Sequence, residues 1–271
     1  MKGYEARETD RQFLPMLPVC ARIDGRSFHT FTRGFKRPFD ELLSELFRHT
    51  TKALVKETGA VIGYTQSDEI SLVLHAPDPD SQIFFEGKIF KLTSVLASIA
   101  TAAFNGMLMR HVYTHPDDVP SAVSKLATFD CRVWQVPDRW EAVNTLLWRE
   151  KDAIKNSISM AASSVYSHAE LEGKSGAEKQ EMLFKKGINW NDYPKWAKSG
   201  TYYRRSTAAR TLTPEELAVI PEKHRPPATE QVLRSDIVAW PFELGKISNK
   251  VEAVFGDVKP VLLSDLAAEK A

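Results

Sequence analysis

A short hairpin with acidic residues at its turn is the sequence feature that most constrains the fold of this chain. The apolar runs 61–66 and 70–74 are rich in β-forming residues, and the three residues between them end in Asp68 and Glu69. Such spacing predicts two antiparallel strands joined by a tight turn. A further acid, Asp24, follows the strand-like run 18–23. The sequence therefore predicts carboxylates at the ends of at least two strands.

The order of the surrounding elements predicts that these carboxylates converge. Residues 40–58 place apolar side chains on one helical stripe that ends at a glycine, a second helical pattern covers roughly 82–110, and 128–136 alternates like a strand. Together they give the order β-α-β-β-α-β, which is the α+β ferredoxin-like plan. In that plan the first and third strands are antiparallel neighbours. Asp24 and Asp68 should therefore meet, although 44 positions separate them.

Paired carboxylates at the edge of a sheet suit divalent metal ions. Mg²⁺ prefers oxygen ligands and is usually held by one or two carboxylates together with substrate phosphates. Two such ions about 4 Å apart can activate an attacking hydroxyl and stabilise the leaving oxygen in a phosphoryl displacement. Such a site is typical of a polymerase palm or a nucleotidyl cyclase. The alternative is structural: Asp68 and Glu69 form an ordinary hairpin turn, and Asp24 ends its strand in an Asx turn.

Composition places few limits on the fold. The chain has 271 residues, of which 43% are hydrophobic, so it can bury one large core, alone or with a substantial appendage. No run approaches the ~18 apolar residues that span a bilayer, and the charged N-terminus is unlike a secretion signal. We therefore expect a cytoplasmic protein without a membrane partner. Cys20 and Cys131 lack metal-ligand spacing and fall on predicted strands, where we expect small buried side chains.

A segment rich in basic and aromatic residues predicts contact with RNA. The net charge of the chain is only +1, but residues 184–210 hold seven basic side chains against one acid, Asp192, interleaved with Trp and Tyr. The basic residues are Lys185, Lys186, Lys195, Lys198, Arg204, Arg205 and Arg210. Basic groups pair with phosphates and aromatic rings stack on exposed bases, as RNA-binding surfaces require. The alternative is a solvated basic face whose aromatic side chains pack inward.

Two sequence blocks resemble the signature of a known enzyme family. Residues 22–29 read Arg-Ile-Asp-Gly-Arg-Ser-Phe-His, and residues 63–71 read Gly-Tyr-Thr-Gln-Ser-Asp-Glu-Ile-Ser. Both are similar to the blocks of the tRNA-His guanylyltransferase superfamily, whose members add nucleotides in the 3′-to-5′ direction with a polymerase-like palm. The resemblance fades after about residue 205, and before that it continues through 88–91, 129–132, 148–152 and 179–181. It implies a nucleotidyltransferase that acts on RNA.

The resemblance also implies roles for individual residues. Asp24 and Asp68 would hold two Mg²⁺ ions together with the Gly25 carbonyl, and Glu69 would support this catalytic cluster. The nucleotide triphosphate would be bound by Asp24, Gly25, Arg26, Ser27, Phe28, His29, Arg37, Asp40, Ser67, Asp68, Lys88 and Lys91. The resemblance implies RNA contacts at Arg132, Arg149 and Asn156, and the composition of the basic segment predicts further RNA contacts at Lys185, Lys186, Arg204 and Arg205.

Several of these residues have simpler interpretations. Asp40 also fits the N-cap position of the helix that follows it. Lys88 and Lys91 are three residues apart on one helical face, where their stems could lie along the apolar stripe. Arg149 and Asp152 have the spacing of an ordinary surface pair on a helix.

One block departs from the family pattern. Eukaryotic guanylyltransferases carry His-Ile-Asn-Asn-Leu-Tyr-Asn in a position tied to recognition of the tRNA-His anticodon, whereas residues 154–160 here read Ile-Lys-Asn-Ser-Ile-Ser-Met and clearly keep only Asn156. The chain therefore resembles the guanylyltransferase-like branch, which performs templated addition on 5′-truncated tRNA. The expected activity is repair of tRNA 5′ ends, with ATP, GTP and other nucleoside triphosphates as substrates.

Three other functions stay open at this point: a dedicated tRNA-His guanylyltransferase that adds G at position −1, a nucleotidyl cyclase, and an RNA-binding module without catalysis. We expect a palm-like catalytic domain at 1–137 and a helical, basic RNA-binding part with a C-terminal tail at 138–271. By analogy with the family, we also expect a homo-oligomer, a tetramer, that binds tRNA.

Overall fold

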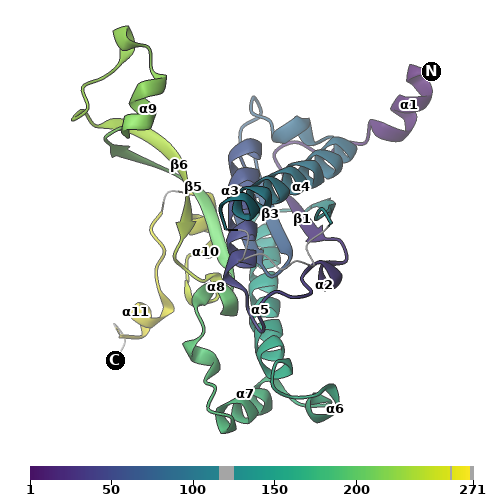
Figure 1. Ribbon diagram of the computed structural model, residues 1–271. Coiled ribbons are helices and arrows are strands. Elements are labelled where there is room, and N and C mark those ends of the chain that lie inside the picture. The colour runs from purple at the N-terminus through teal and green to yellow at the C-terminus, as the bar shows by residue number, and fades with distance from the viewer. Residues whose placement is uncertain (116–124, 257, 269–271) are drawn as a thin grey trace.

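An antiparallel sheet of six strands organises the structure. The computed structural model describes residues 1–115, 125–256 and 258–268 (Figure 1). The strands run in the order β4-β1-β3-β2-β5-β6, and each neighbouring pair is antiparallel. Their bounds are β1 Val19–Gly25, β2 Ile62–Gln66, β3 Glu69–Leu74, β4 Phe129–Gln135, β5 Thr201–Arg210 and β6 Val232–Trp240.

The predicted hairpin and the predicted strand neighbours are confirmed. β2 and β3 pair from Gln66 and Glu69 onward, so Ser67 and Asp68 form the turn between them. Ser67 takes a left-handed φ of 55°, as tight hairpin turns require. β1 pairs with β3 in a register that puts Asp24 opposite Glu69. The acids predicted at two strand ends therefore lie at one edge of the sheet.

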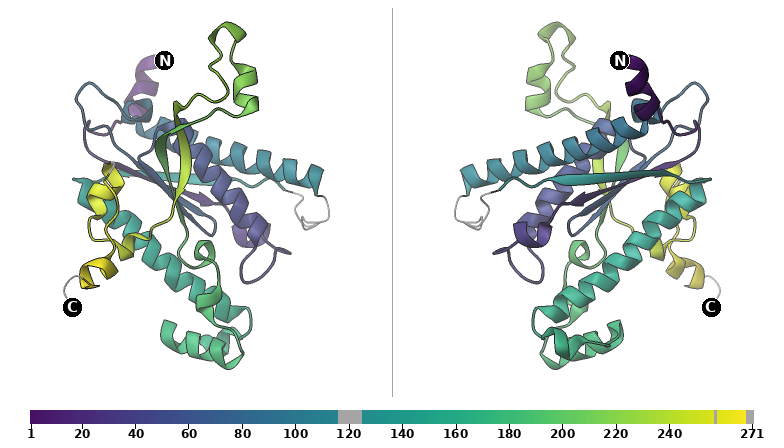
Figure 2. Two further views of the ribbon diagram at one scale, coloured as in Figure 1. Left: turned by 90° about the vertical axis from the view of Figure 1, so that its left-hand side faces the viewer. Right: turned by 90° about the vertical axis from the view of Figure 1, so that its right-hand side faces the viewer.

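Helix α3 (Glu41–Thr58) packs on one face of the sheet (Figure 2). It begins where the sequence predicts, because the Asp40 side chain accepts a hydrogen bond from the Leu43 backbone N–H at 2.9 Å. It ends at Gly59, which has the left-handed φ of 66° typical of a C-cap. Its apolar stripe is buried in the core through Leu46, Phe47, Leu54 and Val55.

Helix α4 (Ile89–Thr114) lies beside α3 on the same face. It begins later than predicted, because Phe85 and Glu86 adopt left-handed φ values in the 3₁₀ turn Phe84–Gly87 and so interrupt the helical pattern. Among the described helices, α4 alone is long and apolar enough to cross a membrane. It is also a core helix, since Leu92, Leu96, Ala100, Phe104 and Leu108 pack with α3 and the sheet.

The opposite face of the sheet is covered by α5 (Arg139–Ser163) and by part of the C-terminal segment. α5 begins at Asp138, whose side chain accepts a hydrogen bond from the Glu141 backbone N–H at 2.9 Å. This second core contains Cys20, Ile62, Tyr64, Val73, Ala142, Val143, Leu146, Tyr202, Trp240, Leu244, Ile247 and Val254. The sheet is therefore sandwiched between α3 and α4 on one side and α5 on the other.

Both cysteines are buried free thiols, as the sequence predicts. Burial raises the pKa of Cys20 to about 11 and that of Cys131 to about 12. Both side chains are therefore protonated at neutral pH and act as small apolar groups in the core.

The C-terminal part is not purely helical, contrary to the prediction. β5 and β6 are strands that extend the sheet beyond β2. In β5, Tyr202 and Tyr203 are both buried and pack in the cores on opposite faces of the sheet. The Tyr202 ring lies 4.6 Å from the ring of Tyr64 and 5.9 Å from that of Trp240. The basic and aromatic composition hid this two-residue alternation.

The hairpin of β5 and β6 extends beyond the rest of the sheet. β5 pairs with β2 over Thr201–Tyr203, and with β6 over Tyr202–Arg210. The far end of this hairpin projects from the body of the protein and carries α9 (Figure 1). The remaining helices are α1 Lys2–Thr9, α2 Phe28–Phe31, α6 His168–Leu171, α7 Gly176–Lys185, α8 Lys195–Lys198, α9 Pro214–Val219, α10 Lys250–Phe255 and α11 Leu263–Ala268. β5 lies in the predicted second domain and joins the sheet of the first; the division at 137 stays a prediction.

The close packing of α3 on β2 predicts a large cost for a side chain at Gly63. A Cβ there would lie 2.6 Å from Val55 Cγ2 and 3.0 Å from Thr51 Cγ2. Gly63→Ala should therefore lower the free energy of unfolding by about 1–3 kcal/mol, as overpacked cores do. Gly106→Ala in α4, where a Cβ meets nothing within 4 Å, should raise it by up to about 1 kcal/mol. Urea denaturation of both variants measures the difference, and equal effects would contradict this packing.

Candidate active site

The carboxylates of Asp24 and Asp68 lie at the junction of β1 and the β2–β3 turn. The Gly25 backbone N–H donates to the Asp68 carbonyl oxygen at 3.0 Å, which fixes the end of β1 against the turn. Asp24 Oδ2 accepts a hydrogen bond from Arg22 Nη2 at 3.2 Å, and Asp68 Oδ1 accepts one from Ser67 Oγ at 3.0 Å. Both carboxylates line one polar cavity of about 730 Å³.

Glu69 is held by two arginines. Arg149 donates from Nε to Oε1 at 2.5 Å and from Nη2 to Oε2 at 2.6 Å, and Arg22 Nε lies 2.7 Å from Oε2. Arg149 also lies 3.4 Å from Asp152, in the helical spacing predicted, but its side chain is 13% exposed and so is not a surface group. Both oxygens of Glu69 therefore accept from guanidinium groups, whereas Asp24 and Asp68 make fewer contacts of this kind.

Burial disfavours the charged forms of Asp68 and Glu69. It raises the pKa of Asp68, and the nearby charge of Asp24 raises it further. Burial also raises the pKa of Glu69, although the charge and hydrogen bonds of Arg149 oppose that shift. Two carboxylates that repel each other in a partly desolvated place are stabilised by a bound cation. The electrostatics therefore favour cation binding between Asp24 and Asp68.

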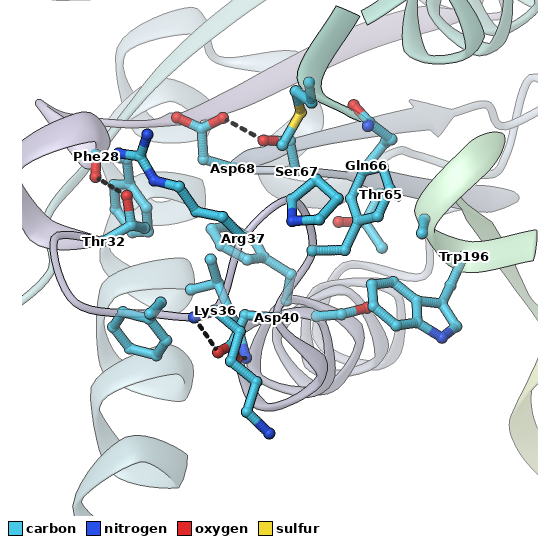
Figure 3. Close-up of a pocket in the computed structure, with 18 of the residues that line it drawn as sticks. Phe28, Thr32, Lys36, Arg37, Asp40, Thr65, Gln66, Ser67, Asp68 and Trp196 are labelled. Carbon is cyan, nitrogen blue, oxygen red and sulfur yellow. Dashed lines mark hydrogen bonds between the residues drawn. The ribbon is translucent and has the colours of Figure 1, made fainter. Parts of the chain in front are cut away.

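An aromatic cavity of about 410 Å³ adjoins the polar one (Figure 3). The two cavities share the lining residues Gln66, Ser67, Asp68, Met160 and Ser163. The walls of the aromatic cavity include Phe28, Phe35, Phe39, Phe47 and Trp196, together with the basic side chains of Lys36, Arg37 and Arg48. Volumes of a few hundred cubic ångströms with apolar walls and a few polar groups are typical of small-molecule sites. Asp68 thus stands between two different binding spaces.

Asp40 and Arg37 both line this aromatic cavity, as Figure 3 shows. Asp40 also has the simpler role that its position predicted. Its Oδ1 caps α3 through Leu43, and its Oδ2 accepts from the Lys36 backbone N–H at 2.9 Å. These two bonds fix the loop that carries Arg37, so the cap itself shapes the cavity.

Residues 25–29, which the family resemblance assigns to binding of the triphosphate, form a tight turn that a buried aromatic ring holds in place. Ser27 has a left-handed φ of 54°, and a Cβ at Gly25 would lie 2.2 Å from the Phe28 ring. Arg26 and His29 are exposed, whereas Phe28 is 3% exposed. The Phe28 ring packs with Phe31, Phe47, Phe104 and Phe129. A buried ring therefore holds the turn beside Asp24.

The structure does not bring Lys88 and Lys91 to the carboxylates of the same chain. They lie at the start of α4, where Lys88 bridges to Gln12. Leu14, close to Gln12 in the chain, is hydrogen-bonded to Gln135, the last residue of β4. Gln135 pairs with Val19, which lies at the opposite end of β1 from Asp24. Lys88 Nζ lies 3.3 Å from Glu86. Within one chain, the geometry gives no support to the prediction that these lysines neutralise the triphosphate.

The predicted RNA-binding residues are spread over several elements. Arg132, 60% exposed, lies 3.4 Å from Asp130 on β4, and Asn156 lines the polar cavity and donates to Asp152 at 3.2 Å. Lys185 and Lys186 lie at the end of α7, far from β5 in Figure 1. On β5, Arg204 donates to the carbonyl oxygens of Ala253 and Gly256, and Arg205 donates to that of Lys56. Lys185 and Lys186 therefore lie on a different element from Arg204 and Arg205.

Arg22, Trp148 and Ser159 line the polar cavity, although sequence reasoning assigned them no role. Arg22 could have been found, because it is two residues before Asp24 and so points to the same face of β1. Ser159 accepts a hydrogen bond from Lys179 at 3.1 Å, which brings α7 to the cavity. That contact depends on tertiary packing and has no local signal.

Comparison with known proteins identifies the family. The model of the tRNAHis guanylyltransferase family matches residues 1–137, which include β1, the β2–β3 turn and β4. The chain belongs to this family. Its members named in the comparisons are nucleotidyltransferases, so the predicted enzyme class is confirmed.

Individual relatives extend the match beyond residue 137. The tRNA(His) guanylyltransferase of Schizosaccharomyces pombe is 29% identical over 219 residues, which are 76% of this chain and 78% of the relative. A bacterial tRNA(His) guanylyltransferase-like protein, solved in complex with ATP, is 40% identical with a TM-score of 0.68 and covers 75% of this chain and 86% of its own. Another such bacterial structure, in complex with GTP, is 34% identical with a TM-score of 0.65 and covers 88% of each chain.

The raised pKa of Asp68 predicts that its charge destabilises the metal-free protein. In the folded chain the pKa lies above its unfolded value, so the ionised group costs folding free energy at pH 7, and this cost is lost as the pH falls through the raised pKa. Asp68→Asn should therefore raise the Tm at pH 7 in metal-free buffer, and its advantage should shrink on acidification. Asp80→Asn, at an exposed acid, is the control and should leave the Tm unchanged both at pH 7 and at acidic pH. An advantage that grows at low pH would contradict the sign of this shift.

Proposed function

We propose that this protein is a template-dependent 3′-to-5′ nucleotidyltransferase that repairs the 5′ ends of tRNA. The observation that carries the proposal is the position of Asp68, which lies beside Asp24 and lines both the polar and the aromatic cavity. A reaction between a nucleotide and the end of an RNA needs two adjoining binding spaces with charge-neutralising groups between them.

The strand order supports a polymerase palm as the catalytic unit. The order β4-β1-β3-β2, with α3 and α4 on one face, supports the proposal of a split β-α-β-β-α-β plan. The antiparallel pairing of β1 with β3 supplies the two acids of such a palm from different parts of the sequence.

Asp24 and Asp68 fit Mg²⁺. Within residues 1–115, 125–256 and 258–268, no group of three or more His, Cys, Asp or Glu side chains lies together as a metal site. Two carboxylates, with substrate phosphates and water as the other ligands, are nevertheless the usual oxygen set for this ion. We propose that Asp24, Asp68 and the Gly25 carbonyl hold two ions. Bound there, Mg²⁺ would neutralise phosphate charge and favour in-line displacement.

The aromatic cavity fits a nucleoside triphosphate. Aromatic rings such as Phe35 and Phe39 can pack against a base, while Arg37 and Arg48 can pair with phosphates. Two bacterial relatives are solved with ATP and with GTP. We propose that ATP and then other nucleoside triphosphates bind in this space.

The proposed reaction has two displacements at phosphorus. First, an oxygen of the RNA 5′-monophosphate attacks the α-phosphorus of ATP, and pyrophosphate leaves. Then the 3′-hydroxyl of an incoming nucleoside triphosphate attacks the activated 5′ phosphate, and AMP leaves. Watson-Crick pairing with the opposite strand of the RNA selects the incoming nucleotide.

The block at 154–160 supports templated repair over recognition of one anticodon. Ser157 is buried, and its hydroxyl, which has one hydrogen to donate, lies within hydrogen-bond distance of the carbonyl oxygens of Ile154 (2.8 Å) and Lys198 (3.1 Å) while it accepts from Trp190 Nε1 at 3.2 Å. Ser159 is bonded to Lys179. Side chains engaged within the protein in this way are poorly placed to read bases.

Alanine at either proposed metal ligand should abolish activity and spare the fold. Asp24→Ala and Asp68→Ala should each lower both adenylylation and nucleotide addition by roughly 100-fold or more, because charge neutralisation in the transition state is lost. Circular dichroism should barely change. Asp130→Ala is the matched control, since Asp130 pairs with Asp24 in the sheet but is 54% exposed and lines neither cavity. Activity within tenfold of wild type for either ligand variant would contradict the metal assignment.

The added base should follow the opposing base and ignore the anticodon. The test uses one 5′-truncated acceptor stem on a tRNA-His body and on another tRNA body, with the anticodons exchanged and the opposing base varied. Labelled products are then sequenced. Addition of G whatever the opposing base, or a strong preference that travels with the His anticodon, would instead support a dedicated tRNA-His guanylyltransferase.

A further inference from the structure

Trp148 is a large aromatic side chain at the mouth of the polar cavity. It lines that cavity together with Asp24 and Asp68, yet the residue is 60% exposed. Aromatic rings of this size are usually covered, and an exposed one beside a catalytic cavity offers its face to a ligand. The proposed metal site and the two displacements leave Trp148 without a role.

The ring of Trp148 is connected to the carboxylates through Arg149. The Arg149 guanidinium carbon lies 4.8 Å from the centroid of the Trp148 ring, within the range of a cation–π contact. The same guanidinium makes the bidentate pair with Glu69, which lies opposite Asp24 in the sheet. The ring therefore contacts a group whose position relative to Asp24 is fixed.

Two lysines and one acid lie beside Trp148 on α5, and the acid, Asp152, lies 3.4 Å from Arg149. Lys151 and Lys155 follow Trp148 at spacings of three and seven residues, so they lie on the same side of the helix, and both are exposed. Asn156, which lines the cavity, is eight residues from Trp148. An aromatic ring followed by cations along one stripe is the arrangement with which proteins bind single-stranded nucleic acid, where bases stack and phosphates pair with the cations.

We propose that Trp148 is a stacking platform for the base of the 5′-terminal nucleotide of the RNA. The proposal rests on the nucleotidyltransferase function above and adds a binding subsite to it. Stacking there would hold the terminal nucleotide in the polar cavity, so that its 5′ phosphate lies near Asp24 and Asp68. The free nucleotide occupies the adjoining aromatic cavity. The lysines along α5 favour RNA over a second free nucleotide, because they offer charge to phosphates beyond the first.

Three variants separate stacking from other roles of the ring. Trp148→Leu keeps an apolar side chain but removes the aromatic face, and Trp148→Phe keeps a smaller face. Trp140→Leu is the matched control, because Trp140 is on the same helix, is 57% exposed and lines neither cavity. Trp148→Leu should raise the KM for 5′-truncated tRNA by about tenfold or more, as expected when a base loses its stacking partner. Trp148→Phe should restore most of this loss, and Trp140→Leu should match wild type.

Crosslinking places the base directly. A 5′-truncated tRNA with 5-iodouridine as its terminal nucleotide is irradiated with wild-type protein, and the modified peptide is identified by mass spectrometry. We expect the crosslink at Trp148, and we expect it to be lost in Trp148→Leu while thermal unfolding of that variant stays unchanged.

The outcomes distinguish this inference from the function on which it rests. If the wild-type protein adds no nucleotide to any truncated tRNA, the proposed function fails and the subsite with it. If the wild type is active but the crosslink forms elsewhere, or Trp148→Leu keeps the wild-type KM for RNA, the stacking proposal alone is overturned. It is also overturned if the KM rises for the incoming nucleotide and not for the RNA, since the ring would then stack on the free substrate.

Discussion

The bidentate ion pair between Glu69 and Arg149 links the two halves of the candidate active site. Glu69 belongs to β3 and Arg149 to α5, so the pair fixes the helix over the end of the sheet that carries Asp24 and Asp68. Both side chains are largely buried, and removing one partner of such a pair typically costs about 3–5 kcal/mol because the other charge is left uncompensated. Arg22 joins Glu69 to Asp24 on the same face. The polar cavity therefore exists because this network holds its walls together.

The site combines a rigid base with carboxylates that are unfavourable on their own. Phe28 and the aromatic rings around it fix the turn after β1 from the α3 and α4 side of the sheet. Above it, Asp68 is partly desolvated beside Asp24, and its pKa is raised. Electrostatic destabilisation of this kind is common where a charged group must be available to a substrate. The packed core supplies the stability that offsets it.

Local signals in the sequence predicted the parts of the fold that local chemistry determines. The hairpin turn at Ser67 and Asp68 and the caps at Asp40 and Gly59 follow from residue type and spacing, and the structure confirms them. The meeting of Asp24 with Asp68 followed from the topology that these elements allow. The late start of α4 depends on left-handed residues at Phe85 and Glu86, which ordinarily avoid that conformation and so gave no warning.

Other features depend on contacts between distant segments and could not be predicted in this way. β5 is a strand because Tyr202 packs between Tyr64 and Trp240, two residues that are far from it in sequence. Arg149 was assigned to RNA, but its partner Glu69 is 80 residues away. The two cavities are likewise products of packing between the sheet, α3 and α5. The chemistry of single residues was visible in the sequence, whereas their division between two binding spaces was not.

The central claim is that Asp24 and Asp68 together form a divalent metal centre at the meeting point of the two cavities. Crystals of the protein grown with ATP and Mn²⁺, an ion with oxygen-ligand preferences close to those of Mg²⁺, would locate the ions by anomalous scattering. We predict anomalous peaks in contact with both carboxylates, with ATP in the aromatic cavity and Glu69 still paired with Arg149. Peaks bound elsewhere, or ATP bound with no ion at Asp24 and Asp68, would contradict the claim.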